Sequence, residues 1–226
     1  MKGKARDAMN QKSPGTVGPF RLPTPRFPEH AFEPVISAQT VRSQLAWQQA
    51  QVTAVNDALA THPEWLGLTI EELLRRLPEM PEALRSVVAT RGASHANHQF
   101  FWKILNPGML APPPPALHDA IHNEYGSLAG LREAFEAEAM GIDGDGWAFV
   151  VMNPDQGMRI EVLALRDDAS VLPLGRPGLL VCDLWEHAWA ADYADRRTWL
   201  AAFWQLIDWP VVAARREGIL QGIKQL

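Results

Sequence analysis

Two short stretches of the chain carry side chains suited to binding a metal ion. In Asp183-Leu184-Trp185-Glu186-His187, a carboxylate directly follows an apolar run and an imidazole comes four residues later. Buried carboxylates are costly unless they are paired or metal-bound, and Asp and His on rigid elements are common ligands. His98, on a helix face with aromatic residues, is the second candidate. Because Asp-x-x-x-His is common by chance and a lone His is more often a core residue, both interpretations stay open.

Other histidines and acidic residues make weaker candidates. His95 lies one turn before His98 and could be either a ligand or a core residue. His118 and His122 have the spacing of a helical metal pair, but their helix is polar and we expect a solvated face. Asp143-Gly144-Asp145-Gly146 resembles the start of a calcium loop without its remaining ligands, and we discard it.

A helical pattern over residues 36–60 would position part of a site. Its apolar stripe is interrupted by Gln44 and Gln48, which lie on or beside it at i,i+4 spacing. Either the two glutamines sit at the edge of the stripe, partly solvated, or this face looks into a polar site. The stripe itself consists of Val41, Leu45, Val52, Val55 and Leu59.

The remaining patterns predict two domains. Thr69 caps a short helix to about residue 77, with Glu72 in the capping-box position, and Pro81 opens a longer helix towards Leu105. The proline-rich stretch 106–115 separates this helical hairpin from the second half. There we expect a small antiparallel sheet with strands at 146–152, 158–165 and 179–182, and helices at about 116–124, 127–141, 186–191, 196–207 and 209–217. The fold class is therefore α+β: an N-terminal helical hairpin domain (29–110), then an α+β domain (116–226) with a small three-stranded antiparallel sheet.

Composition narrows the classes of function. The chain has 226 residues, is 47% hydrophobic and carries a net charge of −5, which argues against a nucleic-acid binder. No apolar run is long enough for a membrane span, and the start has no signal-peptide core. The single cysteine, Cys182, fits a reducing compartment, so we expect a cytoplasmic protein. Residues 1–28 are basic and proline-rich without apolar periodicity, and we predict a disordered, solvated tail rather than a transit or contact arm.

Taken together, these motifs resemble the iron/manganese superoxide dismutase family over about residues 27–217. The resemblance is carried by His95-Ala96-Asn97-His98 with Phe101-Trp102, by Gly146-Trp147-Ala148, by Asp183-Leu184-Trp185-Glu186-His187-Ala188, and by Ala202-Phe203-Trp204 with Asp208-Trp209. It implies a mononuclear iron or manganese site, one per subunit, and disproportionation of superoxide to oxygen and hydrogen peroxide.

The resemblance implies ligands, with one departure. Family members hold the metal by three His, one Asp and a solvent molecule. His98, Asp183 and His187 match three of these ligands, whereas the fourth, a His on the first long helix, matches Gln44. An amide oxygen is a hard, neutral ligand acceptable to manganese or ferrous iron but weaker than imidazole.

Further departures surround the ligands. The family's gateway His matches Gln48, and its neighbouring active-site Tyr has no counterpart. The outer-sphere Gln of many manganese members matches Asp167, and an interface Tyr matches Ala190, while Trp147 preserves the aromatic surroundings of the metal. These changes leave two alternatives: an active dismutase, or a catalytically impaired dismutase-like dimer that acts as a binding or scaffold protein, a pseudoenzyme.

The resemblance also implies an assembly. In the family, the Glu before the last His ligand reaches across a two-fold dimer to that ligand in the other subunit, and the matching pair here is Glu186 and His187. We therefore expect a homodimer with superoxide as its small-molecule substrate, and neither nucleic acid nor membrane as partner.

Overall fold

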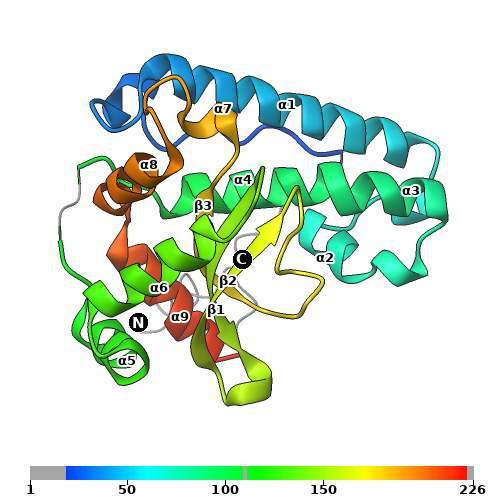
Figure 1. Cartoon of the computed structure of the whole chain (residues 1–226). Coiled ribbons are helices and arrows are strands. Elements are labelled where there is room, and N and C mark those ends of the chain that lie inside the picture. Colours follow the sequence, from blue (N-terminus) through cyan, green and yellow to red (C-terminus); the bar gives the residue numbers. More distant parts are fainter. Residues whose placement is uncertain (1–18, 109–110, 223–226) are drawn as a thin grey trace, which may run out of the picture.

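The computed structural model describes residues 19–108 and 111–222. A helical hairpin is followed by an α+β part, as predicted. In Figure 1, α1 runs along the helical row of α3 and α4, α7 packs on α1, and the three-stranded sheet lies against α4. In chain order the helices and strands are α1 (Ala38–Ala60), α2 (Ile70–Arg75), α3 (Glu82–Val87), α4 (Ala93–Ile104), α5 (Pro115–Tyr125), α6 (Leu128–Met140), β1 (Gly146–Asn153), β2 (Arg159–Arg166), β3 (Gly178–Asp183), α7 (Glu186–Trp189), α8 (Arg196–Phe203) and α9 (Trp209–Leu220).

Local capping defines the starts of the hairpin helices. The Ser37 side chain accepts the Thr40 N–H at the start of α1, and the predicted capping box between Thr69 and Glu72 is present at α2. The predicted helix from Pro81 to Leu105 is one continuous helical run that contains a π-helical segment at Val88–Gly92 between α3 and α4.

The sheet fixes the position of the buried carboxylate. Its order is β2-β1-β3, all antiparallel, and every residue of the central strand β1 is buried. A strand that is buried on both faces has a continuous apolar sequence, whereas a half-buried strand alternates apolar and polar residues. The register pairs Trp147 of β1 with Asp183 at the end of β3, and α4 packs on β3. The sheet therefore brings the end of β3 towards the α4 histidines. The predicted helix 196–207 is α8 followed by a short 3-10 turn, Trp204–Leu206.

The predicted tail is wrong for its last part. Residues 1–18 lie outside the described residues, but 19–28 pack on the fold. Phe20 is buried, and its backbone exchanges two hydrogen bonds with the Asn56 side chain, at 2.6 and 2.8 Å. Arg26 pairs with Asp208 at 3.3 Å. Two phenylalanines, Phe20 and Phe27, in a proline-rich segment form no periodic pattern, so only the tertiary structure shows that the segment packs.

Replacing Phe20 with alanine is expected to lower the free energy of unfolding by about 3 kcal/mol, because a buried ring leaves a cavity. Denaturant unfolding of the metal-free protein measures this change. The exposed neighbour Thr24, replaced by alanine, serves as the control and should change stability by less than about 0.5 kcal/mol. If Phe20→Ala lowered the free energy of unfolding as little as the Thr24 control does, the packing of Phe20 would add nothing to the stability of the fold.

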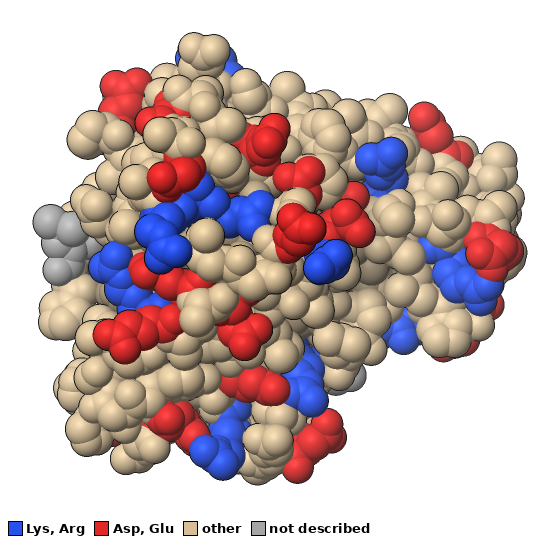
Figure 2. Space-filling model, viewed as in Figure 1, with Lys and Arg blue, Asp and Glu red and all other residues tan. Residues whose placement is uncertain are grey.

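The surface carries charge of both signs. On the face shown in Figure 2, Lys and Arg side chains are interspersed with Asp and Glu rather than gathered in one patch. Within residues 19–108 and 111–222, no helix has the length and apolar character needed to cross a membrane.

Candidate metal centre

Asp183 is a fully buried carboxylate at the end of β3. Its Oδ1 accepts the Trp185 backbone N–H at 3.0 Å, and its backbone carbonyl accepts the Trp199 indole N–H at 2.8 Å. These contacts fix the side chain and leave Oδ2 facing the two histidines of the candidate site. The carboxylate is thereby oriented before any ligand is bound.

His98, on α4, presents one nitrogen to the same point. Its Nδ1 lies 2.8 Å from the Ser94 carbonyl oxygen, one helical turn earlier, and must donate to it. Nε2 therefore carries the lone pair and points towards Asp183. Burial lowers the pKa of His98, although the charge of Asp183 opposes that effect. A neutral imidazole with a free Nε2 is the form that binds metals.

His187 supplies the second nitrogen, and the third ligand atom, from the first turn of α7. Its ring stacks on Trp47 of α1 at 5.2 Å and on Trp185 at 5.8 Å between centroids. Burial lowers the pKa of His187, but the charge of Asp183 and a hydrogen bond to it outweigh burial and raise the pKa overall. Among the described residues, Nδ1 of His187 has no hydrogen-bond partner.

The three side chains converge closely. Asp183 Oδ2 lies 3.1 Å from His187 Nε2 and 3.5 Å from His98 Nε2, and the two nitrogens are 3.3 Å apart. A point in the plane of these atoms lies about 1.9 Å from each, close to the ~2.0–2.2 Å bonds that His and carboxylate ligands make to a transition metal. Within the described parts of the chain, this is the one His/Cys/Asp/Glu group with such convergence. The donor set fits a single metal ion.

Gln44 and Gln48 are both completely buried, which excludes a partly solvated edge for either. Gln48 Nε2 lies 3.2 Å from His95 Nδ1 and 3.5 Å from its carbonyl, so this side chain is directed to α4. Gln44 lies one turn earlier on α1, beside Trp47, which stacks on His187. Among the residues that the structure describes, neither polar atom of the Gln44 amide has a hydrogen-bond partner. A fully buried amide without a partner is costly, so bound water or a ligand at these atoms would stabilise the fold.

Indole rings enclose the histidines. Trp147 lies edge-on to His98 at 4.8 Å, and Trp47 packs against Trp185 at 5.8 Å. The indole N–H groups of all three tryptophans are buried without an acceptor in the described protein. Trp47 is not among the site residues predicted from the sequence, although its position between Gln44 and Gln48 on one helix was a usable signal. These unpaired donors indicate bound water or a small polar ligand in the site.

The assignment of Asp167 to the metal surroundings is wrong. Asp167 is exposed and has a left-handed backbone (φ 54°) directly after β2, with its N–H bonded to the Asp145 carbonyl. The next residue, Asp168, is the one that turns inward: 9% of its surface is exposed, and its Oδ1 has no hydrogen-bond partner within the described parts of the chain. Burial raises the pKa of Asp168, and the charges of Asp183 and Asp167 add to the effect.

Replacing Asp168 with asparagine should stabilise the metal-free protein above neutral pH by on the order of 1 kcal/mol. Folding raises the pKa of Asp168, so wild type loses stability as pH rises from about 4, the usual Asp range, through the raised pKa. The advantage of the variant should vanish at lower pH, where both chains are neutral at this position. Thermal unfolding across pH measures it, with Asp167→Asn as control. A pH-independent difference would contradict this account.

The other histidine candidates lie outside the cluster. His95 is buried and bonded to Gln48, and burial lowers its pKa to about 3, with the charges of His98 and Lys103 adding to the shift. His118 and His122 are exposed and stack on each other at 6.4 Å, in agreement with a solvated face.

A helical hairpin joined to an α+β domain, with one His/His/Asp cluster between them, defines a class of proteins with a single-metal site. Comparison with known proteins specifies the class. Residues 19–106 match the alpha-hairpin domain of iron/manganese superoxide dismutases, and residues 113–215 match their C-terminal domain. The chain therefore belongs to the iron/manganese superoxide dismutase family.

Individual relatives agree with this membership. The chain is 34% identical to Superoxide dismutase (Mn) of Thermus aquaticus over 195 residues, 85% of this chain and 95% of that protein. It is 33% identical to Superoxide dismutase (Mn) of Listeria monocytogenes over 192 residues, 84% and 94% of the two chains. It is 34% identical to Superoxide dismutase (Mn/Fe) of Methylomonas sp. (strain J) over 203 residues, 89% and 99%.

Proposed function

We propose that the protein disproportionates superoxide at one iron or manganese ion per subunit, held by His98, Asp183, His187 and the amide oxygen of Gln44. The observation that carries the fourth ligand is the Gln44 amide, which is fully buried and has no hydrogen-bond partner among the described residues. It lies on α1, which packs on the helices that carry His98 and His187, and these two histidines form the convergent trio with Asp183. The names of the relatives support the metal and the substrate. A hard, neutral amide oxygen suits manganese or ferrous iron.

The bound metal would supply one-electron redox chemistry, so that two superoxide ions and two protons give one oxygen and one hydrogen peroxide. The protein's part is positioning. Ser94 fixes the tautomer of His98, the two indoles beside His187 hold its ring, and Asp183 brings a negative charge. The buried tryptophan walls limit the access of bulk water, and their indole N–H groups have no acceptor among the described residues.

The test is the metal content of freshly purified protein and the dismutase turnover of the same sample, after growth with manganese or iron. We expect about one metal per subunit and turnover well above that of the free ion. Protein that is fully loaded but inactive would overturn the catalytic proposal and leave a metal-binding scaffold.

That scaffold, a catalytically impaired dimer, is the second candidate. Two observations favour it. The Gln48 side chain is directed to His95, and the Gln44 position carries no imidazole. A glutamine amide does not titrate at physiological pH, so it cannot replace a histidine as a proton donor.

We further propose a homodimer in which Glu186 of a second copy accepts a hydrogen bond from His187 Nδ1. Glu186 is exposed on the first turn of α7, next to a His187 nitrogen that has no partner among the described residues. A carboxylate at that nitrogen would orient the ring and make it a better ligand. Cytoplasmic location is proposed on the unpaired, buried Cys182, which fits a reducing compartment.

Replacing Glu186 with alanine should weaken both the dimer and metal retention, the latter by about 10-fold or more. Sedimentation over a concentration series and metal content measure the two effects. The control is Glu138→Ala, an exposed glutamate on α6. A wild-type monomer, or a Glu186 variant that keeps its dimer and its metal, would contradict this assembly.

A further inference from the structure

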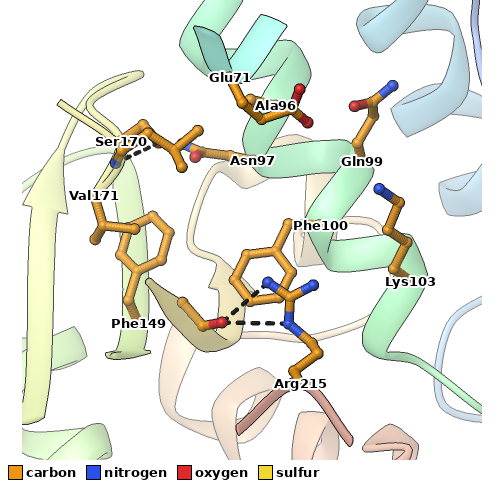
Figure 3. Close-up of a pocket in the computed structure, with 12 residues that line it drawn as sticks. Glu71, Ala96, Asn97, Gln99, Phe100, Lys103, Phe149, Ser170, Val171 and Arg215 are labelled. Carbon is orange, nitrogen blue, oxygen red and sulfur yellow. Dashed lines mark hydrogen bonds between the residues drawn. The ribbon is translucent and has the colours of Figure 1, made fainter. Parts of the chain in front are cut away.

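A second polar cavity lies away from the metal centre, where α2, α4 and α9 meet the start of β3. It has a volume of about 20 Å³, enough for a water-sized or slightly larger occupant. Figure 3 shows charged and amide side chains around it, namely Glu71, Asn97, Gln99, Lys103 and Arg215. None of them belongs to the candidate metal centre.

Arg215 is a buried cation without a carboxylate partner. Its surface is 5% exposed, and its Nε and Nη2 both donate to the Gly178 carbonyl, at 3.2 and 3.0 Å. Its guanidinium lies 4.2 Å from the centre of the Phe100 ring. Among the described residues, no carboxylate lies within ion-pair distance of the Arg215 guanidinium, and no acceptor forms a hydrogen bond with Arg215 Nη1. Burial lowers the pKa of Arg215 to about 9, although the charge of Glu71 opposes that shift.

The glycine at position 178 makes room for the Phe100 ring that lies beside the Arg215 guanidinium. A Cβ on Gly178 would meet the Phe100 ring at 2.4 Å, so glycine is required for the ring to lie against this strand. The same residue offers the carbonyl that receives two of the guanidinium donors. Arg215 is therefore held in place with its third nitrogen, Nη1, left over.

Lys103 and Glu71 do not neutralise the cavity by direct pairing. Lys103, exposed at the mouth, forms no ion pair among the described residues. Partial burial lowers its pKa against the opposing charge of Glu71, and the charge of Arg215 lowers it further. Glu71 is 8% exposed and also lacks an ion pair with any described residue. With both cations and Glu71 charged, the cavity has a net charge of +1.

We propose that this cavity binds one small monovalent anion, of the size of chloride, between Arg215 Nη1 and Lys103 Nζ. One negative charge would make the cavity neutral and give the unpaired guanidinium nitrogen an acceptor. Glu71 on the opposite side would repel a second negative charge, so divalent sulfate should be rejected. The anion would tie α4 of the hairpin domain to α9 of the C-terminal domain.

The test uses the purified, metal-loaded protein in sodium chloride, bromide, formate or sulfate at matched ionic strength. The melting temperature should rise saturably with the three monovalent anions and not with sulfate. In a crystal soaked with bromide, the anomalous signal should lie at Arg215 and Lys103. Lys103→Gln should raise the anion concentration needed for half-saturation at least 10-fold. The control Arg132→Gln, which replaces a surface arginine paired with Glu136, should leave that concentration unchanged.

Two further variants test the cavity without removing the buried positive charge of Arg215, whose complete loss could prevent folding. Arg215→Lys retains a charge and should fold with weakened anion affinity. Glu71→Gln removes the repulsion, so it should tighten chloride binding and admit sulfate. If the melting temperature showed no saturable difference between the anions, the cavity would hold only water. If bromide were found at other positions and Lys103→Gln bound anions as wild type does, the signal would come from an adventitious ion only. Either result overturns the proposal.

Discussion

Replacing Asp183 with asparagine is expected to abolish metal retention, with an affinity loss above about 100-fold. Loss of a residue that only supports a ligand typically costs ~10–100-fold, and Asp183 is itself the one anionic member of the trio. Asparagine has nearly the same shape, so its side-chain oxygen can still accept the Trp185 N–H. Metal content and dismutase turnover of the purified variant measure the effect.

The same substitution should leave the metal-free fold intact. A neutral amide is less costly to bury than a carboxylate, so the thermal stability of the metal-free variant should equal or exceed that of metal-free wild type. Asp143→Asn, in an exposed loop, is the matched control and should keep full metal content. Retention of metal by Asp183→Asn would show that the convergence of the trio is not a metal site.

Replacing Gln44 with histidine is expected to raise affinity for iron or manganese by about 10-fold or more, because imidazole is the stronger donor. The substitution fills a similar volume at a fully buried position. Turnover should rise little, since Gln48 stays bonded to His95 and Asp168 still places an acid near the site. Competition with a chelator measures affinity, and Gln49→His, on the exposed side of α1, is the control.

Because Asp168 rather than Asp167 faces inward, it is the position to combine with Gln44. The pair Gln44→His and Asp168→Asn should raise turnover by more than the sum of the separate gains, since neighbouring groups in one polar network are not additive. Gln44→His that binds no more metal than wild type would show that the Gln44 side chain does not reach the ion. The fourth ligand of the proposed function would then be wrong.

Local sequence was sufficient for many of the helices and strands and for two candidate ligands of the metal centre, Asp183 and His187. The α1 stripe, the Thr69 capping box and the apolar run of β1 predicted their helices and strand because each depends on neighbours within a few residues. Asp183 and His187 were recognisable since four residues bring a strand end and a helix turn together. The partnership with His98 came from the resemblance to a family, not from spacing.

Tertiary structure alone decided where several side chains point. Gln44 could equally have been an edge residue, and only the packing of α1 against α4 and α7 buries its amide without a partner. Asp167 has a left-handed backbone directly after β2 and is exposed, whereas the next residue, Asp168, is buried. Phe20 and Arg215 meet residues 36 and 37 positions away, at Asn56 and Gly178. Contacts of that separation depend on how whole elements pack, and local periodicity carries no information about them.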